Sequence, residues 1–345
     1  MPFRAITGHR PLLDLLARAV ARDTLPPSLL FAGPEGVGKR LTALALASAL
    51  NCDRPTDLDR RGDIGGDAPM SAGKDACGVC ASCKRIGRGV HADVLLIEPG
   101  DSGSIKIDQV RDAIDRTGYR PFEGRRRVVI IDDADALVAN AQDAILKTLE
   151  EPPSASVFVL ITSRPDVLMP TVRSRCQRLR FGPLSPRDVA AVLERDHGMS
   201  PTEAHAAAAA ADGSIGRALD GSAEDAIEAR DAATALLKGA ATSSDPLRRL
   251  QGAKALVGTG TADRDELSRR LLAMSSLIRD LGLLQSQADD RTLANADLKP
   301  QLQSLLRSFE GDRTLHAFAV VDRALWALDR NASPKIVADW LALNI

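Results

Sequence analysis

A glycine-rich segment constrains the fold of this chain more than any other part of its sequence. Residues 33–40 read Gly-Pro-Glu-Gly-Val-Gly-Lys-Arg. Residues 28–32 are mostly apolar and predict a short buried strand, and residues 39–50 are rich in Ala and Leu and predict a helix. Backbone N–H groups bind phosphate where a strand enters a helix through such a loop. The segment therefore predicts an α/β domain built around a nucleotide-binding loop.

The final position of the loop departs from the phosphate-binding pattern. In that pattern Gly, four residues, Gly and Lys are followed by Ser or Thr, whose hydroxyl binds Mg²⁺. Here Arg40 replaces the hydroxyl residue, and Thr42 points to another side of the helix. We expect the loop to keep its fold. Whether it binds a nucleotide stays open, and a plain glycine-rich turn is the alternative. The candidate phosphate-binding residues are Gly33, Gly36, Gly38 and Lys39.

Two aspartates form the second part of the candidate nucleotide site. The β-branched run at 128–131 predicts a central parallel strand, and Asp132 and Asp133 follow it directly. Asp132 occupies the position of the aspartate that lies near Mg²⁺ in an ATPase. Asp133 occupies the position of the water-activating residue, which is usually Glu, and a carboxylate displaced by ~1 Å can cost on the order of 100-fold in rate. A solvated acidic turn is the alternative interpretation.

The cysteines form a second candidate site. Three of the five cysteines, Cys77, Cys80 and Cys83, have the spacing of thiolate ligands around one Zn²⁺. Cys52 is the best fourth ligand and His91 the reserve candidate. An iron–sulfur site or free thiols are the alternatives. Since no base for catalysis lies near the pattern, we expect the metal to be structural.

The pattern of strands and helices predicts the domain organisation. Strands alternate with helices up to residue 182, which predicts a parallel five-stranded sheet covered on both faces. The predicted strands are 28–32, 94–97, 128–131, 157–162 and 177–181, with helices at 107–116 and 141–150. Residues 53–76 are polar and predict a mobile insertion within the zinc module at 52–83. The predicted domains are an α/β domain over 1–182, a small helical lid over 183–240 and an all-α domain over 241–345.

The segment Ser174-Arg175-Cys176 follows the fourth predicted strand. One interpretation is a basic loop in which Arg173, Arg178 and Arg180 are solvated. The other is an arginine finger, in which Arg175 is offered to the γ-phosphate of a neighbouring subunit. Cys176 is expected to pack as a small apolar residue.

Composition limits the classes of function. The net charge is −1 and aromatic residues make up 3% of the chain, which argues against a nucleic-acid-binding module with a basic field and stacking platforms. No stretch approaches the roughly 20 apolar residues needed to span a bilayer. From these features we expect a cytoplasmic protein without a membrane partner.

The residues 142–153, Gln-Asp-Ala-Ile-Leu-Lys-Thr-Leu-Glu-Glu-Pro-Pro, resemble the signature of AAA+ clamp-loader subunits. That family has the glycine loop, the acidic strand end, the four-cysteine zinc module and Ser-Arg-Cys in the same order, so the resemblance covers residues 1 to about 220. It implies an AAA+ P-loop domain, a helical lid and a C-terminal collar domain through which subunits assemble. In it, Thr162 matches the polar end of the fourth strand and joins the candidate nucleotide-binding residues.

Within this family the chain resembles the delta-prime members of the bacterial DNA polymerase III clamp loader more than the ATP-hydrolysing gamma/tau members. Arg40 and Asp133 depart from the hydrolysing pattern, Gly216 stands where a lid arginine is expected, and Arg217 is one position off. An active gamma-type ATPase is the alternative.

The resemblance implies a subunit without its own catalysis. Its Arg175 would complete the ATP site of a neighbouring subunit. Its partners would be the gamma/tau and delta subunits, with the sliding clamp and primed DNA bound through the complex during DNA replication. Its metal would be a structural zinc held by Cys52, Cys77, Cys80 and Cys83, and binding of ATP by the chain itself is in doubt.

Overall fold

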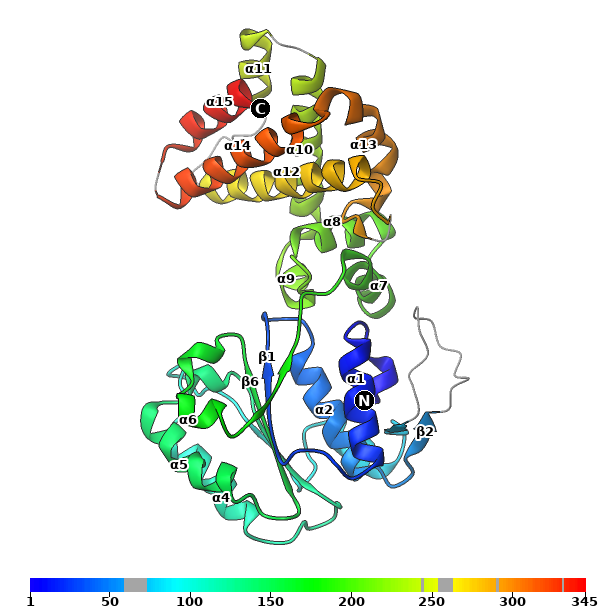
Figure 1. The fold of residues 1–345 in the computed structure, drawn as a ribbon, viewed down its shortest axis with the longest axis vertical. Coiled ribbons are helices and arrows are strands. Elements are labelled where there is room, and N and C mark those ends of the chain that lie inside the picture. Colours follow the sequence, from blue (N-terminus) through cyan, green and yellow to red (C-terminus); the bar gives the residue numbers. More distant parts are fainter. Residues whose placement is uncertain (59–72, 243–244, 254–262, 290–291, 331) are drawn as a thin grey trace. The chain divides into compact units, whose positions relative to one another are not determined.

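The computed structural model describes residues 1–58, 73–242, 245–253, 263–289, 292–330 and 332–345. These residues divide into two compact units, Met1–Pro183 and Leu184–Ile345. The first unit contains the sheet and the second is helical (Figure 1). The predicted fold class is therefore confirmed. The further division of the second unit near residue 240 stays a prediction, and helix α10 (Ala223–Thr242) runs through that position.

The five strands of the first unit form a parallel sheet in the order β4-β5-β6-β1-β7. Their bounds are β1 (Ser28–Ala32), β4 (Val94–Ile97), β5 (Arg127–Ile131), β6 (Ser156–Thr162) and β7 (Gln177–Arg180). Pairing of Ala32 with Thr162 and of Ile131 with Leu160 brings the carboxyl ends of the central strands to one edge. The residues that follow β1, β5 and β6 therefore meet there, as expected of parallel strands.

Apolar side chains alternate between the two faces of the sheet and form two cores. Leu29 and Phe31 of β1 belong to one core with helices α1 (Arg10–Ala21) and α2 (Lys39–Asn51). Leu30 belongs to the other core, with α4 (Ile107–Thr117), α5 (Ala139–Glu150) and α6 (Pro170–Arg173). All five residues of β1 are buried, because a central parallel strand is covered on both faces. Helix α1 was not among the helices predicted from the sequence.

The region between α2 and β4 contains a small substructure that the sequence patterns did not predict. Strands β2 (Thr56–Leu58) and β3 (Gly73–Asp75) pair antiparallel, and α3 (Ala81–Gly87) follows them. The predicted mobile insertion thus has ordered ends, and its residues 59–72 lie outside the described part of the chain. Asp75 is fully buried and accepts hydrogen bonds from the backbone N–H of Phe3 at 2.7 Å and of Arg4 at 3.2 Å. The N-terminus is therefore tied to this substructure.

The second unit is built from helices around two apolar cores. Ser185 caps its first helix, since its Oγ accepts a hydrogen bond from the N–H of Asp188 at 3.0 Å, and a proline follows at the first helical position. The helices besides α10 are α7 (Pro186–His197), α8 (Pro201–Ala210), α9 (Ile215–Asp220), α11 (Pro246–Ala253), α12 (Asp263–Gln285), α13 (Lys299–Leu305), α14 (Asp312–Asp329) and α15 (Pro334–Asn344).

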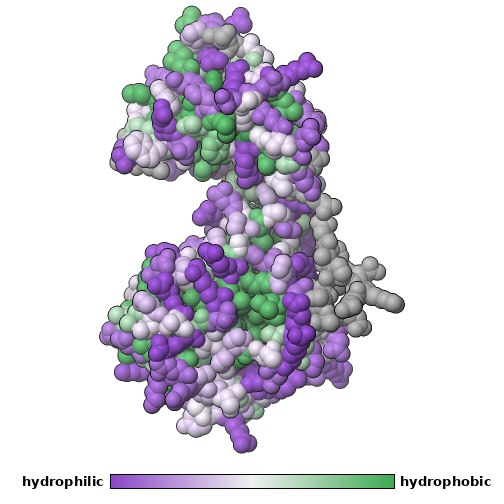
Figure 2. All heavy atoms as spheres, viewed as in Figure 1, coloured by the Kyte–Doolittle hydropathy of each residue, from purple (hydrophilic) through white to green (hydrophobic). Residues whose placement is uncertain are grey.

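Hydrophilic side chains cover most of the face drawn in Figure 2, and apolar ones gather in smaller groups. No helix in the described residues combines the length and apolar character needed to cross a membrane.

Candidate functional site

The glycine loop has the backbone conformation that its sequence predicts. Gly36 and Gly38 have φ angles of 70° and 98°, a region that favours glycine. Gly33 has a different reason to be glycine, because a Cβ there would lie 2.1 Å from the backbone oxygen of Phe181. The N–H of Gly33 also donates to the oxygen of Thr162 at 3.2 Å. The loop is thus fixed between β1, β6 and the residue after β7.

Lys39 is turned into its own loop. Its Nζ donates to the backbone oxygens of Gly33 at 2.7 Å and of Pro34 at 2.5 Å, and the residue is 6% exposed. Burial lowers the pKa of Lys39, although nearby carboxylates such as that of Glu35 oppose this. Thr42 also bonds within the loop, since its Oγ1 donates to the oxygen of Gly38 at 3.0 Å. Both side chains thus bond to backbone oxygens of their own loop.

Arg40 makes the contacts that distinguish this loop. Its Nη1 forms an ion pair with Glu98 and a second one with Asp132 Oδ2 at 3.3 Å. The side chain of Asp132 is 14% exposed, whereas those of Arg40 and Glu98 are about half exposed. No sequence motif indicated Glu98 as a site residue. Its position directly after β4, at the carboxyl end of a parallel strand, is the signal that could have identified it.

Asp132 and Asp133 follow β5 as predicted, but they differ in exposure. Asp133 is exposed and has a φ of 49°, and its N–H donates to Asp132 Oδ1 at 3.2 Å. Burial raises the pKa of Asp132, and the charge of Asp133 raises it further while Arg40 opposes the shift. Burial likewise raises the pKa of Asp133, with a further contribution from Asp135. The site is therefore rich in carboxylates, with Arg40 as a balancing cation.

Thr162 is hydrogen-bonded to Asp135, an aspartate that no sequence motif indicated as a site residue. Its Oγ1 donates to Asp135 Oδ1 at 2.7 Å, and it accepts from the N–H of Arg164 at 3.0 Å. The Nε of Arg164 donates to Asp135 Oδ2 at 2.8 Å. Burial disfavours the charge of Asp135, but its bonds to Thr162 and Arg164 outweigh this and lower its pKa. The role of Thr162 toward a nucleotide stays a prediction.

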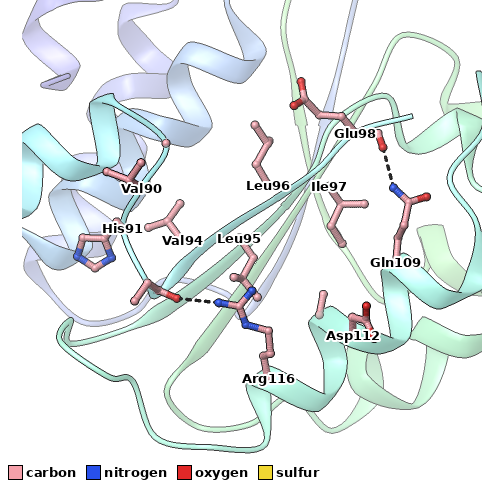
Figure 3. A pocket seen from close by; sticks show the side chains of 13 residues that line it. Val90, His91, Val94, Leu95, Leu96, Ile97, Glu98, Gln109, Asp112 and Arg116 are labelled. Atoms are coloured by element: carbon pink, nitrogen blue, oxygen red, sulfur yellow. Dashed lines mark hydrogen bonds between the residues drawn. The ribbon is translucent and has the colours of Figure 1, made fainter. Parts of the chain in front are cut away.

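A cavity of about 460 Å³ lies along β4, one of the two edge strands of the five-stranded sheet (Figure 3). Two side chains of α4 hold the strand at its ends: Gln109 Nε2 donates to the oxygen of Glu98 at 3.1 Å, and Arg116 Nη2 donates to the oxygen of Ala92 at 3.4 Å. Figure 3 shows that the Glu98 carboxylate is directed away from Gln109. The backbone of Glu98 is thus fixed while its side chain is available to Arg40.

The four predicted metal ligands, Cys52, Cys77, Cys80 and Cys83, lie together. Their Sγ atoms are all within 4.8 Å of one another, and the Sγ atoms of Cys52 and Cys80 are 3.9 Å apart. Four thiolates around one Zn²⁺ at ~2.3 Å would have Sγ separations of about 3.8 Å. Three sulfurs accept backbone hydrogen bonds, for example Cys52 from the N–H of Cys77 at 3.3 Å. The cluster could therefore hold a metal ion.

His91, the reserve ligand, lies outside this cluster. Its Nε2 is 2.9 Å from Ser82 Oγ, and its Nδ1 accepts a hydrogen bond from the N–H of Asp93 at 3.2 Å. Since both ring nitrogens have partners within the protein, the histidine is a buried structural residue. In the described residues the cysteine cluster contains no histidine.

Arg175 lies between α6 and β7 at the surface of the first unit. Its Nη1 donates to the oxygen of Thr171 at 2.9 Å, its Nη2 forms an ion pair with Glu150, and the side chain is 31% exposed. Its Nε is buried and has no hydrogen-bond partner in the described residues. Cys176 is buried in the adjacent core as predicted, and burial raises its pKa to about 12.

Gly216 and Arg217 lie on α9 of the second unit. The N–H of Arg217 donates to Ser214 Oγ at 3.2 Å, which caps the helix, and its guanidinium is 3.5 Å from Asp212. The Arg217 side chain is 62% exposed and thus stands at the surface of its own unit.

Comparison with known proteins gives the family. Residues 8–185 match the family model described as "DNA polymerase III, delta subunit". The delta-prime subunit of Bacillus subtilis is 35% identical over 178 residues, 52% of this chain and 49% of its own length. The delta-prime subunit of Pseudomonas aeruginosa is 37% identical over 145 residues, 42% of this chain and 39% of its own.

A tau subunit is also similar: that of Salmonella typhimurium is 32% identical over 258 residues, 74% of this chain and 36% of its own length. The alignments thus span less than half the length of these relatives. The family model, in contrast, matches more than half of the 345 residues of this chain. The chain therefore belongs to the DNA polymerase III delta-prime family of clamp-loader subunits.

Proposed function

We propose that this chain is a clamp-loader subunit that does not hydrolyse ATP itself and assists hydrolysis by a neighbour. The observation that carries the proposal is the ion pair of Arg40 with Asp132. A guanidinium stands beside the carboxylate that an ATPase uses near its metal. Hydrolysis needs a metal ion that bridges phosphate oxygens and neutralises charge, and a positively charged side chain opposes such an ion.

Two further features support the loss of hydrolysis. Lys39 donates to Gly33 and Pro34 of its own loop, so two backbone oxygens already occupy the hydrogen-bond donors that a phosphate would need. Asp133 is one methylene shorter than the usual glutamate, and a water-activating carboxylate must lie within hydrogen-bond reach of the attacking water. Arg40, Lys39 and Asp133 would each impair the same reaction, the hydrolysis of ATP. Three such features at one site are not explained by a single substitution that a working ATPase tolerates.

The proposed contribution of this chain to catalysis is Arg175. Its side chain is 31% exposed at the surface of the first unit, where a neighbouring subunit can reach it. Glu150 neutralises the guanidinium in the isolated chain, and a γ-phosphate carries more negative charge than one carboxylate. An arginine finger supplied in trans is worth roughly 10³ to 10⁵ in rate. We infer that Arg175 exchanges Glu150 for the nucleotide of the adjacent subunit.

The metal of the cysteine cluster is proposed to be a structural zinc. Four thiolates complete the tetrahedral coordination of Zn²⁺ and leave no position for a reactive water. The ligands come from the end of α2, from the segment that enters α3 and from α3 itself, so the ion would join the insertion to the body of the first unit. The N–H···S bonds would stabilise the thiolates.

The proposed partners follow from the family. The chain would assemble with the gamma/tau and delta subunits in the cytoplasm and act on the sliding clamp and primed DNA through the complex. Direct contact with DNA is not required by this proposal, and the net charge of −1 gives the chain no general attraction to phosphate backbones.

An active gamma-type ATPase is the second candidate function. It is favoured by the similarity to the tau subunit of Salmonella typhimurium over 74% of this chain. The two candidates differ in the isolated chain, because only a gamma-type subunit would turn over ATP with Mg²⁺ in the absence of partners.

The decisive experiment is reconstitution with gamma/tau and delta subunits. The Arg175→Ala complex should assemble normally and hydrolyse ATP at least tenfold more slowly. Arg173→Ala is the matched control, since Arg173 lies in the same segment and pairs with exposed Asp166 at 2.7 Å. Equal turnover of the Arg175→Ala and unchanged complexes would refute the finger role.

A further inference from the structure

Arg40 connects three elements of the first unit at the carboxyl edge of the sheet. It is the second residue of α2, Glu98 directly follows β4, and Asp132 directly follows β5. One guanidinium nitrogen contacts both carboxylates. The contacts span 58 and 92 residues of sequence, so they depend on the assembled sheet and not on local structure.

Hydrogen bonds fix the main chain at both acidic residues. The N–H of Asp132 donates to the oxygen of Ile97 at 2.9 Å, which extends the β4–β5 pairing to the start of the acidic segment. The oxygen of Glu98 accepts from Gln109 of α4, and the Glu98 side chain is directed away from that bond (Figure 3). Gln109 itself is held, since its Oε1 accepts from the N–H of Lys106 at 2.9 Å. The main chain at Glu98 and Asp132 is therefore held by bonds that do not involve Arg40.

These residues do not fit the divalent metal that a working glycine loop shares with its nucleotide. Magnesium is bound by oxygen atoms, and the loop normally offers a hydroxyl oxygen at position 40. A guanidinium has five N–H donors and no lone pair for a metal. Its charge also repels a divalent cation at the distance of Asp132. The carboxylate on the metal side is thus neutralised from within the chain.

The surroundings also disfavour a nucleotide without metal. Glu35, Asp132 and Asp133 all lie close enough to Lys39 to influence its pKa. A bare triphosphate would add several negative charges beside these carboxylates, and Lys39 would first have to leave Gly33 and Pro34.

We propose that Arg40 is a tethered cation that binds Glu98 and Asp132 in place of a divalent metal and thereby excludes the metal–nucleotide complex from the glycine loop. This inference rests on the proposed non-hydrolysing function and gives it a specific cause. The loop then serves as a rigid part of the fold. Arg40 neutralises the carboxylates of Glu98 and Asp132 beside it, so the stability of the loop does not depend on a bound nucleotide or metal.

The test is a gain of binding in the isolated chain. Titration calorimetry with ATP and Mg²⁺ should give no measurable binding to the unchanged protein. Arg40→Thr restores the hydroxyl and removes the tethered cation, and it should bind at least tenfold more tightly, in a manner that requires Mg²⁺. The double variant Lys39→Ala, Arg40→Thr should lose this binding again, because the gained affinity must use the loop.

Arg111→Thr is the control for charge, since it removes one exposed arginine from α4 and should bind no better than the unchanged protein. Arg40→Ser serves as a second variant in case Arg40→Thr does not fold, as judged by circular dichroism. Tight binding by the unchanged chain, or no gain in a folded Arg40 variant, would overturn the inference. Neither result depends on Arg175, so the finger role is tested separately in the reconstituted complex.

Discussion

Arg175 is held by Glu150, the last residue of α5, through an ion pair at the surface of the first unit. The acid belongs to the Leu-Glu-Glu-Pro-Pro segment and the arginine to Ser-Arg-Cys, two segments separated by β6 and α6. The pair gives a physical link between two motifs that the sequence presents separately. In the proposed function, this pair would hold Arg175 in position before a neighbouring subunit binds.

The first prediction concerns this pair. Glu150→Gln should leave Arg175 in place but remove the competing charge, so that ATP turnover by the reconstituted complex changes by at most about fivefold, since exposed ion pairs are worth ~0–1 kcal/mol. Steady-state ATPase assays check this. Glu151→Gln is the neighbouring control, and a loss as large as that of Arg175→Ala would show that Glu150 has another role.

The second prediction concerns the identity of residue 175. Arg175→Lys should recover little of the activity lost in Arg175→Ala, because an ammonium group cannot contact two phosphate oxygens as a planar guanidinium does. The turnover numbers of the two reconstituted variants provide the comparison. Full activity of the Arg175→Lys complex would mean that only the charge matters.

The third prediction concerns the cysteine cluster. Cys80→Ser should release the metal, measured as zinc per chain by elemental analysis, and lower the thermal midpoint by more than ~5 °C, because metal binding contributes to folding. Cys176→Ser is the control, since Cys176 is buried outside the cluster and should leave the zinc content unchanged. Full zinc in the Cys80 variant would remove this residue from the ligand set.

The fourth prediction concerns pH and begins from a buried aspartate. Asp93 is fully buried, accepts the N–H groups of Phe122, Glu123 and Gly124 at 2.8 Å, and pairs with Arg127 at 2.8 Å. Burial alone would raise the pKa of Asp93, but these bonds outweigh it and lower the pKa from 3.8 to about 2.

Because the folded-state pKa is the lower one, the stability from Asp93 is complete above about pH 5 and is lost as the pH falls toward 2. The shift corresponds to about 2 kcal/mol of unfolding free energy. Asp93→Asn should therefore be destabilised at pH 7 and lose less further stability between pH 5 and 3 than the unchanged chain. Urea unfolding at the two pH values measures this, and parallel losses in both proteins would contradict it.

The fifth prediction concerns the glycine loop. Gly33→Ala should destabilise the first unit by more than ~1 kcal/mol, because the new Cβ would lie 2.1 Å from the rigid backbone oxygen of Phe181. Gly182→Ala is a suitable control, since a Cβ at Gly182 has no heavy atom within 4 Å. Denaturant midpoints that coincide for the two variants would show that the loop can move to make room.

The sequence by itself determined the five strands of the parallel sheet, the glycine loop and the grouping of Cys77, Cys80 and Cys83. These features are local patterns: β1 is a buried apolar run, Gly38 requires a positive φ, and the spacing of Cys77, Cys80 and Cys83 places their thiols near one another. Parallel pairing then made it predictable that Asp132 and the loop share one edge of the sheet. The ribbon β2–β3 was not predictable in this way, since Thr56–Leu58 and Gly73–Asp75 carry few apolar residues.

Only the tertiary structure decided which charges meet. Glu98, Gln109 and Asp135 carry no motif, and their partners lie far from them in sequence or on other elements. The register of β4 against β5 brings Glu98 and Asp132 to the same guanidinium, and the chain turn after β5 gives Thr162 an aspartate as its partner. Ion pairs and hydrogen bonds act over a few ångströms, so they are set by the packing of strands and helices. The sequence alone therefore shows that position 40 has no hydroxyl. That the Arg40 guanidinium contacts Glu98 and Asp132 follows only from the tertiary structure.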